Sequence, residues 1–312
     1  MEKTMQYGKY RFVCRLESEA ALPFFKGSTF RGVFGHALKR VVCALRLREC
    51  PDCLLRETCL YPQVFERSRD DSVHPFVIEP PVDGERRYQA GERFDCSLIL
   101  FGESVQRLPY FVYAFEQMGE IGIGGRVNGS RGRFVLEEVQ AGGNVIYSKE
   151  TRSLLKSEGM EPLSLGDGDK AAGSVRVTLE TPLRLKFENR LTAELPFHVL
   201  VRAMLRRVSS LFNTFGGGEP ELDYRGLVRE AQAVRTKASS LRWFDWERYS
   251  NRQQTRMLMG GLIGSVTYEG DLGQYLPLLD LASIVHIGKQ TTFGMGKIAW
   301  ELKAPVDLRE ER

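Results

Sequence analysis

The 312-residue sequence lacks a long hydrophobic run. Its longest uncharged apolar stretch is LPYFVYAF at 108–115, far short of the roughly 20 residues that span a bilayer. Its N-terminus, MEKTMQYGKYRFV, also lacks the apolar core of a secretory signal peptide. These absences argue against a helical membrane protein and predict a cytoplasmic protein with no membrane partner.

Lysine is scarce, because the chain has 12 Lys against 32 Arg, and the net charge is +4. Arginine presents a rigid, permanently charged fork that pairs with phosphate and stacks on bases. The bias is typical of an RNA- or DNA-binding protein, although a GC-rich genome would produce it as well. With 42% hydrophobic and 27% charged residues the composition is globular, and the length predicts two domains.

The same order of elements occurs twice along the chain. Each half reads as a strand, a helix, one or more strands, a second helix opened by Leu-Pro, and a last strand. The expected strands are 10–18, 93–101, 133–140, 174–186, 261–269 and 298–302, and the expected helices are 28–46, 108–118, 198–212 and 276–288. This pattern predicts an α+β fold of tandem ferredoxin-like (βαββαβ, RRM-like) domains with a Cys-rich insertion.

Composition also predicts the domain boundaries. Residues 1–140 form the N-terminal ferredoxin-like domain, with the Cys-rich insertion at 43–65. Residues 141–173 are rich in Gly, Ser and charge and are interpreted as a linker, and 174–312 form the C-terminal ferredoxin-like domain. Two such domains side by side would leave a cleft that suits a single strand or a hairpin of RNA.

A glycine-rich loop, GKQTTFGMGK, lies between the last expected helix and the last strand. Its glycines would let the backbone approach a ligand, and exposed amides form anion-binding concavities. The segment matches neither a P-loop nor the dinucleotide fingerprint. It therefore indicates RNA contact or, alternatively, a flexible connection. The candidate RNA-binding residues of this loop are Gly288, Lys289, Gly294, Gly296 and Lys297.

Four segments in the expected order resemble a known family. They are KGSTFRGVFGHALKRVVC at 26–43, HPFVIEPP at 74–81, WERYSNRQQTRMLMGGLIG at 246–264 and HIGKQTTFGMGKI at 286–298. They resemble the RAMP superfamily of CRISPR-associated proteins, and within it the sixth Cas family, the endoribonucleases that cut precursor CRISPR RNA at each repeat. The resemblance covers essentially the whole chain and implies CRISPR repeat RNA, and the processed crRNA, as partners.

The helix that begins near Ser28 carries the leading catalytic candidate. His36, Lys39 and Arg40 are expected to share a face opposite the apolar stripe, because residues three and four apart are neighbours on a helix. A neutral histidine can take the proton of a ribose 2′-OH, and cations stabilise the extra charge on phosphorus. The resembled family carries its catalytic histidine in this region, which implies His36 as the catalytic residue and Lys39 or Arg40 as the charge stabiliser. The alternative is that His36 is an ordinary surface residue.

The same helix and the other histidines give weaker signals. Arg31 is expected either to bind RNA or to cap a sheet edge. His74 is interpreted as a structural residue, and His198 as a surface or capping residue. His286 ends an apolar helix beside the glycine-rich loop, which favours core packing over RNA contact.

Cysteines divide into two groups. Cys14 and Cys96 lie in apolar strands and are expected to be buried thiols. The other four have the spacing Cys43-x6-Cys50-x2-Cys53-x5-Cys59. In a reducing cytoplasm this is a metal-ligand pattern, and it predicts structural zinc, or alternatively a [4Fe–4S] cluster or unliganded thiols. Four cysteine ligands would leave no position for catalysis, so no cofactor is expected to take part in the reaction.

Basic and aromatic residues alternate in RWFDWERYSNRQQTR at 242–256. Bases stack on aromatic rings and phosphates pair with guanidinium groups, so Arg248, Arg252 and Arg256 are candidate RNA contacts. Alternatively, the tryptophans fill a core between elements and the arginines are solvated.

The residues and the resemblance together predict an endoribonuclease that cleaves precursor CRISPR RNA within its repeats. The expected mechanism is metal-independent attack by the 2′-OH, which gives a 2′,3′-cyclic phosphate and a 5′-OH. One alternative is a non-catalytic RAMP subunit that binds guide RNA in a CRISPR effector complex, whose other subunits would be partners. A more distant alternative is a redox- or zinc-dependent RNA regulator. A titratable group on a basic helix face favours the enzyme.

Overall fold

The computed structural model describes residues 3–46, 49–66, 73–155, 159–166, 172–185, 194–250 and 255–303, without the side chains of 248–250 and 255–256. The helices are α1 Gly27–Val42, α2 Leu60–Phe65, α3 Leu108–Ile121, α4 Phe197–Phe215, α5 Tyr224–Glu230 and α6 Leu276–Val285. The strands of the first half are β1 Met5–Leu16, β2 Ala20–Ala21, β3 Phe76–Glu79, β4 Arg87–Tyr88, β5 Arg93–Phe101, β6 Ile123–Val127, β7 Ser130–Gly132, β8 Phe134–Ala141, β9 Asn144–Ser148 and β10 Glu161–Leu163. Those of the second half are β11 Ser174–Leu183, β12 Arg235–Ser239, β13 Arg242–Ser250, β14 Thr255–Glu269 and β15 Ile298–Leu302.

The first sheet has the strand order β3-β5-β1-β8-β9, and β10 pairs with the start of β1. Every second residue of β1 from Tyr10 to Leu16 is buried, as a strand with one covered face requires. Helices α1 and α3 supply the cover, and their apolar residues share one core with this sheet. Since the four strands β3, β5, β1 and β8 lie in the order expected for a ferredoxin-like domain, the prediction for this half is confirmed.

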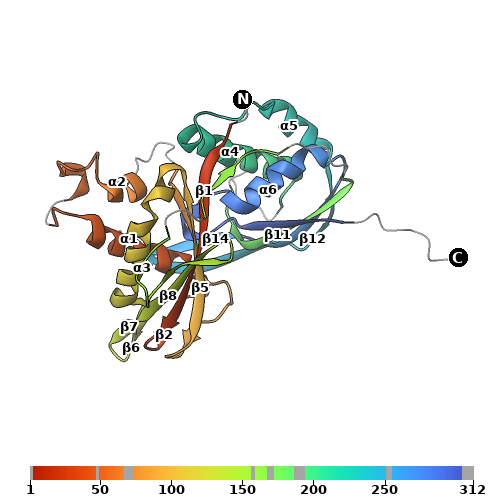
Figure 1. Ribbon diagram of the computed structural model, residues 1–312. Helices are drawn as coiled ribbons and strands as arrows, with labels where there is room; N and C mark the ends of the chain where they lie inside the picture. Colours follow the sequence, from red (N-terminus) through yellow and green to blue (C-terminus); the bar gives the residue numbers. More distant parts are fainter. Residues whose placement is uncertain are drawn as a thin grey trace.

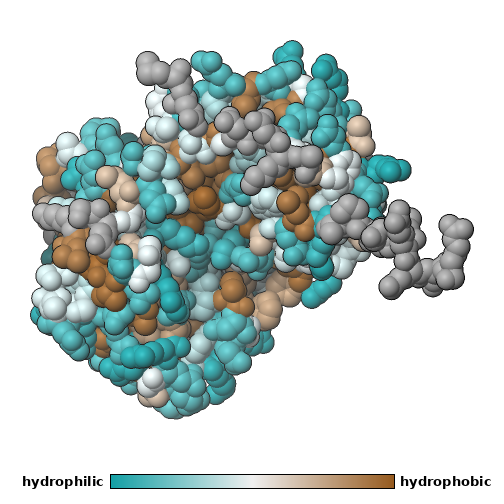
Figure 2. Space-filling view, turned by 45° about the vertical axis from the view of Figure 1, so that its right-hand side comes forward, coloured by the Kyte–Doolittle hydropathy of each residue, from teal (hydrophilic) through white to brown (hydrophobic). Residues whose placement is uncertain are grey.

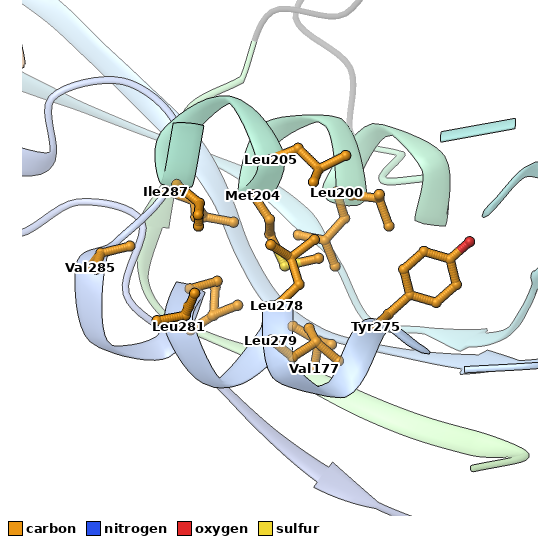
Figure 3. Close-up of a cluster of buried hydrophobic side chains, with 14 of the residues drawn as sticks. Val177, Leu200, Met204, Leu205, Tyr275, Leu278, Leu279, Leu281, Val285 and Ile287 are labelled. Atoms are coloured by element: carbon orange, nitrogen blue, oxygen red, sulfur yellow. The ribbon is translucent and has the colours of Figure 1, made fainter. Parts of the chain in front are cut away.

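The second sheet repeats the arrangement with the order β12-β14-β11-β15, and β13 continues the pairing along the long strand β14. Val175, Val177 and Leu179 point to the buried face of β11 and alternate with exposed residues. Helices α4 and α6 cover that face, and Figure 3 shows Leu200 and Met204 of α4 directed toward Leu278 and Leu281 of α6. The α+β tandem fold is therefore confirmed (Figure 1).

The two halves are packed together through a shared core. Met5, Val77 and Phe101 of the first sheet are buried in the same cluster as the apolar face of α4. The Arg207 guanidinium of α4 lies 5.8 Å from the centroid of the Phe101 ring and donates hydrogen bonds to the carbonyl of Val285. The position of the second half relative to the first is thus fixed by apolar burial.

Two segments differ from the sequence-based expectations. The glycine-rich stretch 119–132, which lies between the expected helix 108–118 and the expected strand 133–140, forms the end of α3 and the hairpin of β6 and β7. Its Gly122 and Gly124 have φ values of 81° and 80°, which glycine alone adopts freely, so glycine here serves hairpin geometry. Within 141–173, expected as a linker, β9 and β10 extend the first sheet. Composition did not predict these short strands, because the residues around them are rich in Gly and Ser.

Among the described residues, no helix is both long and apolar enough to cross a bilayer. Figure 2 shows a mainly hydrophilic face with hydrophobic patches toward its middle. Such a mixture is ordinary for a folded domain.

In the described part of the chain, a small additional sheet of β4, β2, β6 and β7 extends below the first sheet (Figure 1).

Candidate functional site

Helix α1 separates a buried face from an exposed one. Phe30, Val33, Phe34, Ala37 and Leu38 are buried against the first sheet and α3. On the other side Gly32, His36 and Arg40 are exposed. The spacing of four residues places these three positions on one line along the helix. The structure therefore brings His36 and Arg40 together on a solvent-facing surface, as the sequence predicts.

Lys39 lies at the edge of that surface and contacts α2. Its ammonium nitrogen is 5.5 Å from the centroid of the Tyr61 ring. Burial works to lower the pKa of Lys39, but Cys50 and Tyr61, followed by Glu49 and Glu66, raise it overall. Lys39 therefore stays protonated, and it is suited to stabilising negative charge on a substrate and not to accepting a proton.

Arg31 joins three segments that are distant in the sequence. Its guanidinium carbon lies 4.9 Å from the ring centroids of both Phe65 in α2 and Phe293 in the glycine-rich loop. Its Nε donates a hydrogen bond of 3.0 Å to Oγ1 of Thr292. Arg31 thus holds the loop against α1, and a contact between Arg31 and RNA stays a prediction.

The glycines of the loop are explained by contacts within the protein. Gly288, Gly294 and Gly296 have φ values of 81°, 78° and 75°. A Cβ on Gly294 would lie 2.5 Å from the carbonyl oxygen of Ile78, and one on Gly296 would lie 1.8 Å from that of Ile287. Because Ile78 belongs to β3, Gly294 lets the loop pack closely against the first half. The glycine-rich loop 288–297 therefore links the two halves by close packing, and we call this loop the clasp.

A buried carboxylate anchors the clasp. Glu79 at the end of β3 accepts a 3.0 Å hydrogen bond from Nε2 of His286 and lies 2.9 Å from the Lys9 ammonium. Lys297 lies 3.5 Å from the same carboxylate and 3.1 Å from that of Glu180. The Lys297 side chain is 28% exposed and is shared between two acidic partners. Its predicted role at a phosphate remains untested, whereas Lys289 of the same loop is exposed.

The charge state of Glu79 follows from these neighbours. Burial alone would raise the pKa of the carboxyl. The hydrogen bond from His286 and the charges of His286, Lys9 and Lys297 outweigh burial and hold the pKa of Glu79 well below its usual range. His286 is fully buried, and its Nδ1 lies 3.0 Å from the carbonyl of Met295. The expectation that His286 packs in the core is confirmed.

An aromatic and methionine cluster lies beside the clasp. Phe25, Met259 and Met295 are buried there with Trp246 and Phe293 packed against them. The Trp246 ring is 5.2 Å from that of Phe25, so this tryptophan fills a core between elements, as one of the two interpretations of its segment held. Among the described residues, Trp246 Nε1 is buried without a hydrogen-bond partner.

The arginines of that segment fall largely outside the description. Arg248 and Arg256 belong to β13 and β14, but their side chains are not described, and Arg252 lies outside the described residues. The prediction that these three bind RNA is therefore not tested by the structure.

The four clustered cysteines are divided between two environments. Cys43, Cys53 and Cys59 line one cavity of about 350 Å³. Cys50 is buried within hydrogen-bonding reach of Glu66 and Lys39. In the ranges the structure describes, no three His, Cys, Asp or Glu side chains are arranged to hold a metal ion. The arrangement therefore does not fit a four-cysteine site as it stands, and that site stays a prediction. Cys14 and Cys96 are buried, as expected.

The other two histidines lie away from His36. Nδ1 of His74 is 2.8 Å from the carbonyl of Val64, which agrees with a structural role. His198 lies in the first turn of α4.

The sequence alone did not identify Glu79, the carboxylate at the centre of the contact between the two halves. The signal was present, because a lone carboxylate ends the otherwise apolar strand FVIE, and such a carboxylate needs a cationic partner when buried.

Comparison with known proteins assigns the two halves separately. Residues 5–159 match a family model described as the AF_1859 N-terminal domain. Residues 177–298 match the model of the CRISPR-associated endoribonuclease Cas6. An uncharacterized protein of Archaeoglobus fulgidus is 28% identical over 291 residues, which is 88% of this chain and 91% of that protein.

Solved structures share the fold over nearly the full length. Thermus thermophilus Cas6 superposes on this chain with a TM-score of 0.54 at 13% sequence identity. The superposition covers 95% of this chain and 99% of the Cas6 chain. A Cas6 product complex gives 0.55 at 14% identity, with 94% and 100% covered. A partial Cas6-RT-Cas1–Cas2 complex gives 0.60 at 15% identity and covers 96% of this chain, which spans only 46% of that longer one. Residues 177–298 therefore match the CRISPR-associated endoribonuclease Cas6 family, and the chain shares the fold of the solved Cas6 structures over nearly its whole length.

Proposed function

We propose that the protein is an endoribonuclease that cleaves precursor CRISPR RNA within its repeats. The observation that carries the proposal is the exposure of His36 on α1, one helical turn from Arg40, in a chain with the Cas6 fold. A histidine that faces solvent among cations can reach a bound RNA strand. A buried histidine such as His286 cannot.

The proposed reaction is attack by a ribose 2′-OH on the adjacent phosphorus. The 2′-oxygen forms a bond to phosphorus, the bond to the 5′-oxygen breaks, and the products are a 2′,3′-cyclic phosphate and a 5′-OH. His36 moves a proton, either from the 2′-OH or to the leaving oxygen. Arg40 and Lys39 stabilise the charge that develops on the phosphoryl oxygens. No metal ion is assigned a step.

The partners follow from the same proposal. CRISPR repeat RNA is the substrate, and the processed crRNA is the product. One similar solved structure is a Cas6 product complex, and another is a complex of Cas6, RT, Cas1 and Cas2. These two structures support RNA and other CRISPR proteins as partners of this chain, and we propose the subunits of an effector complex as further partners.

End-group analysis tests the reaction. The purified protein is incubated with RNA of the repeat in its own genome, in excess chelator, beside the same RNA with one 2′-deoxyribose at the cut. We expect cleavage of the first RNA into a product with a cyclic phosphate and a product with a 5′-OH. The deoxy-substituted RNA should bind and stay intact. Cleavage of the deoxy-substituted RNA, or a requirement for magnesium, would contradict the mechanism.

The same experiment separates the enzyme from a scaffold. A non-catalytic RAMP subunit that only holds guide RNA would bind both RNAs and cut neither. Binding without cleavage at any RNA concentration would therefore favour the scaffold over the proposed endoribonuclease.

A further inference from the structure

We propose a second RNA-binding site on this protein, in the groove between α4 and α5 of the second half. The site would hold the phosphate backbone of the substrate at a distance from the bond that is cut. This inference rests on the proposed RNA-processing function, because it names where further parts of the same RNA are bound.

Two short rows of arginines border the groove. On α4, His198, Arg202 and Arg206 are spaced four residues apart, and on α5 so are Arg225 and Arg229. An interval of four residues corresponds to a rise of about 6 Å along a helix. All four arginines are exposed. The groove therefore has guanidinium groups along both of its sides.

The floor of the groove is apolar and well supported. Its volume is about 500 Å³, and Leu205, Tyr224 and Val228 line it beneath the arginines. Leu205 is only 3% exposed, so it belongs to the core that α4 shares with α6. Helix α5 is capped by Asp223, whose Oδ1 accepts a 2.8 Å hydrogen bond from the amide of Gly226. The two helices that carry the arginines are thus held in place by core packing of α4 and by the cap of α5.

The lining of the groove carries more positive than negative charge. One carboxylate, that of Glu219, lines it together with the four arginines. In the part of the chain that the structure describes, Arg202, Arg225 and Arg229 make no ion pair. Burial lowers the pKa of His198, and the neighbouring charge of Arg202 lowers it further. Surface arginines elsewhere are paired with carboxylates, as Arg11 is with Asp95.

Phosphate is the anion that this arrangement suits. Arginine pairs with phosphate through two parallel hydrogen bonds and is more weakly hydrated than lysine. A groove with cations on both sides can follow a continuous backbone, and binding is then driven by release of counterions. An acidic protein segment is the competing occupant, and the test below separates the two.

The position of the groove determines which part of the RNA it can reach. Figure 1 shows α4 and α5 at the top of the molecule and α1 on its left-hand side. An RNA that covers only the cut site would therefore not reach the groove. The groove should matter for a full repeat with its flanks and not for a short RNA.

The test compares two double variants on two RNAs. Arg202→Gln with Arg229→Gln removes one cation from each side of the groove. Arg131→Gln with Arg152→Gln removes two exposed arginines of the first half and is the matched control. Each protein is titrated with a full repeat RNA and with a short RNA centred on the cut, at several salt concentrations.

For the full repeat, the groove variant should bind on the order of tenfold more weakly at 0.1 M salt, and its log–log salt slope should be shallower by about 1.4, or about 0.7 for each lost phosphate contact. Binding and single-turnover cleavage of the short RNA should be unchanged, as should both RNAs with the control. Equal affinity and slope for wild type and groove variant on the full repeat would overturn the inference and leave the groove to an acidic protein partner. Failure of wild type to bind or cleave either RNA would instead overturn the proposed function.

Discussion

His286 and Glu79, 207 residues apart in the sequence, meet at 3.0 Å between Nε2 and Oε1 in the buried contact of the two halves. Glu79 ends β3 of the first sheet, and His286 directly follows α6 of the second half. His286 adopts a φ of 57°, an uncommon value for a residue with a side chain. The glycine-rich loop that follows is thereby held against α1, the helix that carries His36.

Replacement of Glu79 should destabilise the protein in a pH-dependent way. Glu79→Gln leaves Lys9 and Lys297 without their shared anion. Because the Lys9 side chain is 46% exposed, the expected loss is on the order of 1 to 3 kcal/mol, less than for a fully buried pair. Because the folded pKa is depressed, the stabilising effect of the carboxylate is full above its ordinary pKa of 4.5 and is lost as the pH falls toward the folded value. Melting temperatures of wild type and variant should thus differ at pH 7 and approach each other progressively as the pH falls below 4.5.

A surface carboxylate supplies the control for this measurement. Glu301 pairs with Lys303 at 2.7 Å and is exposed, so Glu301→Gln should leave the melting temperature unchanged at pH 7. A difference between wild type and Glu79→Gln that stays constant from pH 7 to pH 3 would show that the charge of Glu79 is not what stabilises the contact.

Two glycine-to-alanine substitutions should distinguish the cost of a positive φ from the cost of a steric clash between the new Cβ and the backbone. Gly129 and Gly296 both have positive φ values, of 85° and 75°. A Cβ on Gly129 meets nothing within 4 Å, whereas one on Gly296 would lie 1.8 Å from the Ile287 carbonyl oxygen. Gly129→Ala should cost about 1 kcal/mol from φ strain, and Gly296→Ala about 3 kcal/mol or more. Denaturant unfolding measures both, and equal losses would refute the close packing of the loop.

The two lysines of the loop should respond differently to replacement. Lys297→Ala removes a partner of Glu79 and Glu180 and should lower the melting temperature. Lys289→Ala removes an exposed cation and should lower the melting temperature less than Lys297→Ala does, while the log–log salt slope of RNA binding becomes shallower by about 0.7. If Lys289→Ala binds repeat RNA with the wild-type slope, the loop has no role in holding the backbone.

Elemental analysis tests the four-cysteine site that the spacing predicts. Protein purified without oxygen should contain about one zinc site, or alternatively one iron–sulfur cluster, per chain. The metal should be lost when Cys53 and Cys59 are replaced by Ser. A folded, active and metal-free wild-type preparation would contradict the site and would agree with the separation of Cys50 from the cavity that the other three cysteines line.

The sequence predicted the helices and long strands well because their apolar periodicity reflects burial directly. Strand β5 and strand β15 have the expected bounds, and the apolar and exposed faces of α1 divide as predicted. The loop glycines were harder to interpret, because a glycine that admits a ligand and one that admits another strand look alike in a sequence. The pairing of Glu79 with His286 could not be predicted, since it depends on how the two halves pack.

The central claim is that His36 performs chemistry and not only binding. The most direct measurement is single-turnover cleavage of repeat RNA by wild type and His36→Ala, in chelator and at saturating protein, with affinity measured in parallel. We predict that His36→Ala cleaves about a hundredfold or more slowly than wild type, the usual span for losing a general acid or base, with RNA affinity nearly unchanged. Cleavage by His36→Ala at the wild-type rate would contradict a catalytic role for His36.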